Sequence, residues 1–339
     1  MKENKICIVT VYNACNYGSF LQAYALQEVL KDNNYKTYFI NMPVEHDKII
    51  CSDSKSEDYS EYENKKYIKL VEDQKKFEVI DKVDSSYVSC VVGSDTVWNL
   101  FDKTYSNIPY FTGKGLEECK NIISYAASVG PAKLEKLFLL KFPRLLEIRS
   151  FNHIAVRDEK TEKLVKILRK KPVRVLDPTF LKDLEEIKPQ EKIDKPYILV
   201  YTYGLSDEKV EAIKKYAKEN NLTIIATGSL CKWADMNIAV GSFEWLWLVK
   251  NAECVITTTF HGSIFSIKYN KNFAVLIENS SKINSLLKEF KLSDRICNED
   301  TLIETLKSTI DYTEINKIMD ERIQASKKYL LESVGENLE

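Results

Sequence analysis

The sequence lacks an excess of charge of either sign. Its 339 residues include 49 Lys and Arg against 50 Asp and Glu, which gives a formal net charge of −1. Proteins that bind nucleic acids usually carry a basic surplus, because neutralising phosphates supplies most of their affinity. The balance excludes a typical nucleic-acid-binding protein, so we expect no nucleic-acid partner.

The sequence also lacks the apolar segments that send a chain to or through a membrane. Residues 1–5 lead directly into a short apolar run at 6–11, without the longer apolar region and cleavage site of a secretory signal. No run of about 18 apolar residues follows anywhere in the chain. We therefore expect a cytoplasmic protein with no integral membrane segment.

Cysteine pairs and metal-binding clusters are missing as well. The eight cysteines form no CxxC pair, and Cys7, Cys90 and Cys254 lie inside apolar strand-like runs. A free thiol in such a run behaves as a small hydrophobic side chain, and free thiols are typical of a reducing compartment. No grouping of Asp, Glu and His suggests a metal site, so we expect no metal.

What the sequence contains is a regular alternation of short β-rich runs and helical patterns. Such alternation is typical of βαβ units and mostly parallel sheets. A length of 339 residues favours two domains, and 44% hydrophobic residues supply enough apolar material for two cores. We therefore predict an α/β fold with two doubly wound domains in tandem. Strands are expected at 6–11, 37–41, 88–92, 121–126, 153–157, 197–202, 222–226, 253–257 and 273–277.

Three segments depart from this alternation. Residues 181–195 carry many charges and no strand pattern, which indicates the boundary between the two halves. Residues 314–331 place their apolar side chains on one stripe and predict a terminal amphipathic helix. Residues 45–76 are rich in Lys, Glu, Asp, Ser and Tyr. We interpret them as a partly mobile surface excursion, either a lid or acceptor-side loop or a solvated insertion without a role.

Polar junctions follow four of the predicted strands, at the sheet edge where doubly wound domains bind ligands. The strongest is 257–263, before a predicted helix. Its hydroxyls, glycine and helix-start amides can bind phosphate, and His261 can also pass a proton. At 93–96, Asp95 can act as a general base, accept a hydrogen bond from a sugar hydroxyl, or cap a helix.

The other two junctions give weaker signals. At 13–19, Gly18 permits close approach to the first amides of a helix, although a cap formed by Ser19 explains the pattern equally well. At 201–204, Gly204 offers backbone donors ahead of the next helix. Two basic residues near these junctions, Arg157 and Lys282, can clamp an anion or serve as ordinary charges paired with their neighbours.

Seven stretches of the sequence are similar to those of a known family, and they occur in order along residues 6–296. They read NACNYGSFLQAYALQ at 13–27, VVGSDTVWN at 91–99, SYAASVG at 124–130, AVRDEKT at 155–161, VLDPTFL at 175–181, ECVITTTFHGSIFSIKYNKNF at 253–273 and KINSLLKEFKLSDRI at 282–296. Taken together and in this order, they resemble the polysaccharide pyruvyl transferase family.

The resemblance implies a GT-B-like architecture of two Rossmann-like domains. The first would cover 1–185 on the acceptor side and the second 186–312 on the donor side. A C-terminal helix within 313–339 would cross back onto the first domain. It further implies phosphoenolpyruvate as co-substrate without another cofactor, and a sugar or lipid-linked glycan as acceptor. The product would be a pyruvate ketal, and any membrane association through a lipid-linked acceptor would be peripheral.

The resemblance maps the family's histidine of the FHG motif onto His261 and the aspartate of its GSD motif onto Asp95, and we expect both to be catalytic. The chemistry of ketal formation suggests the remaining roles as a hypothesis. Donor binding would fall to Thr259, Gly262, Ser263, Arg157, Lys282 and Gly204, and acceptor binding to Asn13, Asn16, Tyr17 and Ser94. Similar family members often have arginine at the position of Lys282, and lysine lacks the bidentate fork of arginine. Two alternatives remain open: a GT-B glycosyltransferase that uses a nucleotide-sugar, and a non-catalytic subunit of glycan assembly.

Overall fold

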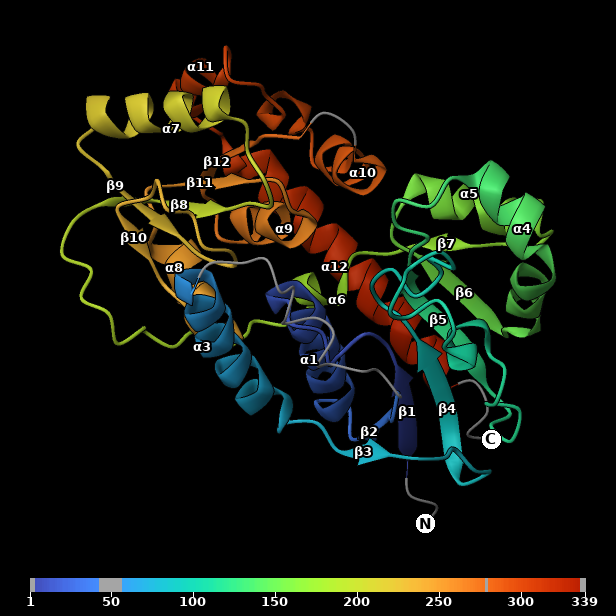
Figure 1. The fold of residues 1–339 in the computed structure, drawn as a ribbon. Coiled ribbons are helices and arrows are strands. Elements are labelled where there is room, and N and C mark those ends of the chain that lie inside the picture. Colours follow the sequence, from blue (N-terminus) through green and yellow to red (C-terminus); the bar gives the residue numbers. More distant parts are fainter. Residues whose placement is uncertain (1–3, 43–56, 278–279, 336–339) are drawn as a thin grey trace.

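The computed structural model of the chain describes residues 4–42, 57–277 and 280–335, and it contains two parallel sheets (Figure 1). The first sheet has seven strands in the order β3-β2-β1-β4-β5-β6-β7, and the second has five in the order β10-β9-β8-β11-β12. The first is built from β1 (Lys5–Val9), β2 (Lys36–Ile40), β3 (Val79–Ile80), β4 (Tyr87–Val92), β5 (Ile122–Ala127), β6 (His153–Val156) and β7 (Val173–Arg174). The second is built from β8 (Tyr197–Tyr201), β9 (Thr223–Ala226), β10 (Met236–Asn237), β11 (Cys254–Thr257) and β12 (Asn272–Val275).

Helices connect the strands, as parallel pairing requires. In the first half they are α1 (Tyr17–Lys31), α3 (Glu57–Gln74), α4 (Leu134–Glu147), α5 (Glu159–Ile167) and α6 (Pro178–Leu181). In the second half they are α7 (Asp207–Glu219), α8 (Ser242–Asn251), α9 (Phe260–Lys268), α10 (Ser281–Glu289), α11 (Leu302–Lys307) and α12 (Tyr312–Gly335). Single 3₁₀ turns lie at Pro109–Thr112, Ile148–Ser150 and Ser293–Arg295.

The central strands are buried on both faces, which explains why their sequences are continuous apolar runs rather than alternating patterns. All six residues of β5 and all five of β8 are buried. Both sheets share the doubly wound order in which the chain starts in the middle and reverses direction. The predicted fold of two tandem α/β domains is therefore confirmed.

The reversal of strand order creates a switch point in each sheet, between β1 and β4 and between β8 and β11. Ligands of doubly wound sheets bind at the carboxyl ends of the strands beside this point. The four polar junctions at 13–19, 93–96, 201–204 and 257–263 follow these four strands. The strand order thus gives a physical reason for polar residues at all four places.

The C-terminal helix α12 returns to the first sheet, as predicted. The side chain of Ser89 on β4 donates a hydrogen bond to the carbonyl of Val334 (2.9 Å), and that of Asn121 donates to the carbonyl of Ser333 (2.8 Å). Figure 1 shows α12 running diagonally from the second sheet to the first. One helix therefore ties the two halves together.

The predicted surface excursion at 45–76 is wrong for its second part. Residues 57–74 form the helix α3, which packs on α1 and α8. Its buried Lys66 donates a hydrogen bond to the carbonyl of Gly228 (2.7 Å), and Asp73 accepts one from the amide of Ser242 (2.7 Å). The sequence pattern did not indicate this helix, because its contacts with the second domain are largely polar. The part of the excursion at 45–56 lies outside the described residues.

The first turn of α1 inserts an aromatic side chain into the second domain. The ring of Tyr17 stacks on Trp245 with centroids 5.5 Å apart, and its hydroxyl lies 3.2 Å from the hydroxyl of Thr227. Phe20, one turn later, meets Phe243 edge-on at 5.6 Å. Apolar contact of this kind holds the two domains in a fixed relation more firmly than polar contact would.

Candidate functional site

The first wall of the site is the loop between β1 and α1. Asn16 caps α1, its side-chain oxygen accepting a hydrogen bond from the amide of Ser19 (3.1 Å). The Ser19 hydroxyl donates to Asp95 Oδ2 (2.9 Å), so the start of α1 is linked to the junction after β4. Asn13 is buried beside them, and Tyr105 reaches its side-chain oxygen at 3.5 Å.

A buried ion-pair network forms the floor. The guanidinium of Arg157 donates to Asp95 Oδ1 (2.9 Å) on one side and to Asp177 Oδ2 (2.8 Å) on the other. Ser94 donates its hydroxyl to the same oxygen of Asp177 (3.1 Å). Burial alone would disfavour such charges, so the network is stable only because each ion has an opposite partner and further hydrogen bonds.

The charges of this floor shift one another's pKa values. Burial raises the pKa of Asp95, but Arg157, His261 and Lys282 outweigh it and leave that pKa below its usual range. The pKa of Asp177 is also lowered, because His261 and Arg157 overcome the effect of burial. Both carboxyl groups are therefore ionised at neutral pH.

The opposite wall is the start of α9. Thr259 caps this helix, its hydroxyl accepting a hydrogen bond from the amide of Gly262 (3.0 Å), and the Ser263 hydroxyl donates to the carbonyl of Thr259 (3.0 Å). A Cβ on Gly262 would lie 2.2 Å from Thr257 Oγ1, so only glycine fits the turn. The Gly262 amide and the Ser263 hydroxyl are thus used by the helix start itself.

His261 lies between the two walls. Its Nε2 is 3.8 Å from Asp177 Oδ2, which is ion-pair rather than hydrogen-bond distance. A Cβ on Gly18 would come within 1.9 Å of Nδ1, so the imidazole rests directly on the backbone of α1. Gly18 therefore allows the second domain to bring its histidine against the first.

The site is narrow but reaches the surface. Asn13, Asp95 and Thr259 are each 8% exposed and His261 is 7% exposed, whereas the residues beneath them, such as Ser94 at 0%, are covered. Two buried polar atoms of the site, His261 Nε2 and Arg157 Nε, have no hydrogen-bond partner within the part of the chain that the structure describes. Unsatisfied polar atoms are uncommon in protein interiors, and here they indicate a place where a polar ligand can be held.

Lys282 connects this place to a larger cavity. Its ammonium lies 5.5 Å from the centre of the Phe260 ring, and the Arg157 guanidinium lies 4.5 Å from the same ring. Burial and the nearby charge of Arg157 lower the pKa of Lys282. An anionic ligand beside it would relieve both effects.

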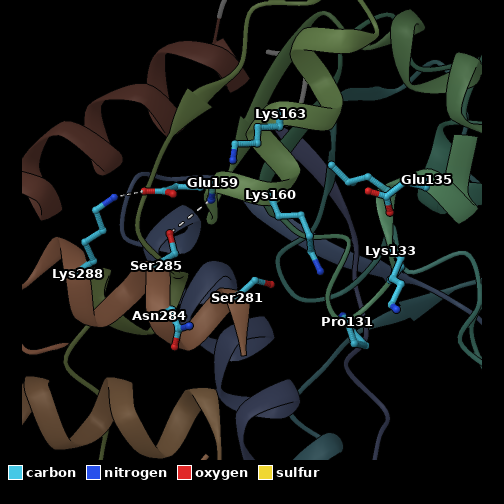
Figure 2. Close-up of a pocket in the computed structure, with 12 residues that line it drawn as sticks. Pro131, Lys133, Glu135, Glu159, Lys160, Lys163, Ser281, Asn284, Ser285 and Lys288 are labelled. Carbon is cyan, nitrogen blue, oxygen red and sulfur yellow. Dashed lines mark hydrogen bonds and ion pairs between the residues drawn. The ribbon is translucent and has the colours of Figure 1, made fainter. Parts of the chain in front are cut away.

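We call two adjoining hollows between the domains the interdomain cavity; each has a volume of about 600 Å³. The inner hollow is bordered by Gly130, Lys160 and Lys282, and the outer one adds Lys133, Lys163 and Lys288. Figure 2 shows the residues of the outer hollow: Lys160 and Lys163 come from α5 and Lys133 from the loop before α4, while Lys288 comes from α10 on the opposite side. Gly130 touches Thr96, the neighbour of Asp95, so the cavity borders the floor described above.

Lys160 is a second cation of this cavity, and sequence reasoning missed it. Burial lowers its pKa. Among the residues that the structure describes, neither Lys160 nor Lys282 lies in an ion pair. Lysine is common on surfaces, so only the position of Lys160 opposite α10 marks it.

Asp177 was missed as well, although it lies within the stretch 175–181 that carries the family likeness. It caps α6 through the Thr179 amide (3.1 Å) and meets Arg157 and His261 with its other oxygen. The available signal was an Asp-Pro pair a few residues after the short strand β7, a pattern that predicts an ordinary helix cap.

Two predicted site residues lie apart from this centre. Gly204 is exposed, with a φ of +64°, and a Cβ added to it would meet no described atom within 4 Å. Tyr17, predicted to contact the acceptor, has only 2% of its surface exposed and is packed in the second domain, so this geometry gives it a packing role. Asn16, by contrast, donates a hydrogen bond to the exposed Tyr203 (3.1 Å) and borders the opening.

This arrangement agrees with a family model described as polysaccharide pyruvyl transferase, which matches residues 16–281 and so most of the chain. The chain belongs to this family. The predicted family is thereby confirmed, and membership implies a transferase of polysaccharide biosynthesis with a sugar or glycan acceptor. No curated protein sequence matches the chain.

Solved structures share the fold at low sequence identity. A putative UDP-N-acetylglucosamine 2-epimerase from Listeria monocytogenes superimposes with a TM-score of 0.58 and 9% identity, over 100% of this chain and 97% of that one. UDP-GlcNAc 2-epimerase from Neisseria meningitidis gives 0.55 and 10%, over 98% and 100%. The glycotransferase of kitacinnamycin gives 0.50 and 10%, over 98% and 100%. These likenesses establish a GT-B-type fold for this pyruvyl transferase family member and carry no further information on its reaction.

A metal site is not formed by the described parts of this chain. Within residues 4–42, 57–277 and 280–335, no three His, Cys, Asp or Glu side chains gather closely enough to hold an ion. The carboxylates of the floor are instead neutralised by Arg157.

The buried carboxylates predict a sharp loss of stability in acid. Because the folded-state pKa of Asp177 is lowered, its contribution is present above the unfolded value of about 3.9 and is lost as pH falls through the folded value. Denaturant unfolding between pH 3 and 7 should show that Asp177→Asn reduces both the stability at pH 7 and the loss below about pH 4. The exposed Asp300→Asn serves as control and should follow the wild type.

Proposed function

We propose that this protein, acting in the cytoplasm, transfers the pyruvyl group of phosphoenolpyruvate to two hydroxyls of a sugar and forms a pyruvate ketal. The observation that carries the proposal is the position of His261, whose buried Nε2 has no hydrogen-bond partner among the described residues. The centre of the Phe260 ring lies 5.4 Å from the centre of the imidazole ring and 5.5 Å from the ammonium of Lys282, which borders the interdomain cavity. Phosphoenolpyruvate carries a carboxylate and a phosphate. Two partly buried ammonium groups, Lys160 and Lys282, which form no ion pair with any described residue, suit such a ligand.

The reaction balances without a further reactant. A proton is added to the methylene carbon of the enol phosphate, and the first sugar hydroxyl bonds to the adjacent carbon as it loses its own proton. The bond from that carbon to the phosphate oxygen then breaks. The second hydroxyl closes the ring, and its proton leaves with the phosphate. The protein must supply one proton early, accept one, and neutralise the departing phosphate.

His261 is the proposed proton donor to the methylene carbon. Protonated, it is stabilised by the ionised Asp177 at 3.8 Å, and Gly18 fixes the ring from the other side. A positioned imidazolium of this kind typically contributes a factor of about 10²–10⁴ to the rate.

Asp95 is the proposed partner of the acceptor hydroxyl. Its Oδ2 accepts one hydrogen bond, from Ser19, and can accept a second. Its lowered pKa makes Asp95 a weak base, so it is proposed to orient the hydroxyl and to take its proton only as the new carbon–oxygen bond forms and the hydroxyl becomes acidic. Asn13 and Asn16, at the same opening, are proposed to hold the sugar, with Ser94 positioning Asp177 from beneath.

Arg157 is proposed to contact the donor with its free Nε and to hold the neighbouring carboxylates in place. Two of its nitrogens are engaged by Asp95 and Asp177, so it holds the floor together rather than clamping a ligand with its full fork. Roles for Thr259, Gly262, Ser263 and Gly204 in donor binding stay predictions. For the first three, an anion would have to share atoms with the cap of α9.

A binding experiment tests the donor. Phosphoenolpyruvate should raise the thermal unfolding temperature, since a ligand at 100 times its Kd stabilises by about 2.7 kcal/mol. Lys282→Ala should weaken that binding by about 10–100-fold, as expected for loss of a hydrogen bond to a charged group. The exposed Lys215→Ala on α7 is the matched control and should bind as the wild type does.

The same measurement separates the rival functions. The fold is also that of enzymes whose structures hold UDP-GlcNAc, so a nucleotide-sugar glycosyltransferase is the second candidate. Stabilisation by a UDP-sugar or GDP-sugar and not by phosphoenolpyruvate would favour that reading. Binding of phosphoenolpyruvate without phosphate release, in the presence of candidate glycans, would favour a non-catalytic subunit.

A further inference from the structure

The helix α4 turns its apolar side outward. Leu139 is 80% exposed, Leu140 61%, Phe142 44% and Leu146 38%, while its inward face buries Leu137 and Leu145. A surface helix of a globular protein normally presents polar residues to solvent and one apolar stripe to the core. α4 is therefore apolar on both sides over its last two turns.

An aromatic side chain beside Lys141 is exposed as well. Phe101 is 38% exposed, and the ammonium of Lys141 on α4 lies 5.5 Å from the centre of its ring. We call the five exposed side chains the α4 patch: Phe101, Leu139, Leu140, Phe142 and Leu146. Contiguous apolar patches on a surface usually mark an interaction site.

Cations surround the α4 patch. Lys133 and Lys136 stand exposed at the start of the helix, and Lys141 lies in its middle. A hollow at the far end, lined in part by Leu146, is bordered by Lys114 and Lys120 and also by Glu117 and Glu147. With Glu135 at the start of the helix, five lysines and three glutamates border the patch. This local excess of cations contrasts with the net charge of −1 of the whole chain.

We propose that the α4 patch docks the protein on an anionic lipid bilayer, with α4 lying in the plane of the interface. Helices that bind in this way combine Leu and Phe on one face with Lys and Arg beside it. Among the described residues, the structure contains no helix with the length and hydropathy needed to span a bilayer. At 14 residues, α4 is shorter than the roughly 20 that a span requires.

The charges favour a bilayer over a second copy of this chain. A twofold dimer through the α4 patch would bring the same surface, with its surplus of lysines over glutamates, against itself. Anionic head groups would neutralise these lysines while the acyl region covers the leucines. Figure 1 shows α4 at the margin of the first domain, on the side away from the second sheet, where a flat surface can approach it.

Docking in this way would also orient the proposed site. The first turn of α4, with Lys133 and Leu134, borders the outer hollow of the interdomain cavity. A bilayer against α4 would lie beside the mouth of that cavity. The docking itself does not rest on the proposed reaction, since vesicle binding is measured without substrate.

Vesicle flotation with the full chain tests the proposal. The protein should float with vesicles of phosphatidylcholine mixed with phosphatidylglycerol and bind pure phosphatidylcholine at least tenfold more weakly, because each lysine near an anionic surface contributes about 1 kcal/mol. Raising the salt should weaken the binding. Leu139→Gln/Leu140→Gln should reduce binding to the mixed vesicles by at least about tenfold, as loss of two buried leucines implies.

The control pair is Ile68→Gln/Ile187→Gln, which removes two exposed apolar side chains outside α4 and should bind as the wild type does. Both pairs should keep the wild-type thermal unfolding temperature, since the replaced side chains are exposed. Equal binding to the two kinds of vesicle, or unchanged binding of the α4 variant, would overturn the proposal. So would a dimer in sedimentation analysis that the α4 variant dissociates, because the α4 patch would then be covered by a second copy.

Discussion

Replacing His261 by glutamine should lower the rate of pyruvyl transfer by about 10²–10⁴-fold, the contribution of a positioned acid–base group. Glutamine fills a similar volume and can still donate a hydrogen bond, but it cannot carry and release the proton that the methylene carbon needs. The affinity for phosphoenolpyruvate should change much less, because Lys160 and Lys282 remain in place. Phosphate release measured with a candidate glycan gives the rate, and thermal shift gives the binding.

The matched control is His153→Gln. This histidine begins β6 on the first sheet, at the strand end opposite the junctions, and is partly exposed. Its replacement should leave turnover unchanged. Full turnover in a folded His261→Gln variant would remove the imidazole from the mechanism. A fall in turnover with an equal loss of phosphoenolpyruvate binding would make it a binding residue instead.

Arg157→Met should have the largest effect on stability of any single change in the site, a loss of about 3–5 kcal/mol in the free energy of unfolding. Arg157 is the cation that directly pairs with both Asp95 and Asp177, and the side chains of Arg157 and Asp177 are each only 1% exposed. Removing one partner of a buried ion pair is costly because the other charge is left uncompensated. Denaturant unfolding at pH 7 measures the change.

Two further variants identify the cause of that loss. Arg174→Met removes an arginine that pairs with Glu289 and Glu162 but is 22% exposed. Solvent partly screens this charge, so the loss should be smaller, about 1 kcal/mol. Adding Asp95→Asn and Asp177→Asn to Arg157→Met should recover part of the stability, because the uncompensated charges disappear. If the triple variant were less stable than Arg157→Met alone, the network would be stabilising through packing rather than charge.

The His261→Gln and Arg157→Met variants test different properties of the site. Loss of His261 should reduce turnover with the floor intact, whereas loss of Arg157 should loosen the floor that holds Asp95 and Asp177 in place. Comparing them therefore separates proton transfer from the positioning of charge. This separation is useful because both residues also lower the pKa of the same two carboxyl groups.

The strands and most helices could be predicted from the sequence because they depend on local pattern. Buried parallel strands are continuous apolar runs, and the helices begin at recognisable caps such as Asp158 and Ser206. The helix α3 could not be predicted in this way. Only three of its residues, Tyr62, Lys66 and Leu70, are buried, so it has no strong apolar stripe. Its stability comes from contacts with α1 and α8, which are distant in sequence.

By itself, the sequence determined the α/β class, the family likeness and the polar junctions after four central strands, including Asp95 and His261. These are properties of local composition and order. Only the tertiary structure showed that Asp177 and Arg157 form an ion pair beneath Asp95 and His261. It also showed that the imidazole of His261 packs against Gly18 and that Tyr17 is a packing residue. It also decided that α4 keeps an apolar outer face. The physical reason is that charge networks and exposed surfaces depend on which segments meet across the fold, and periodicity along one segment carries no record of its partner.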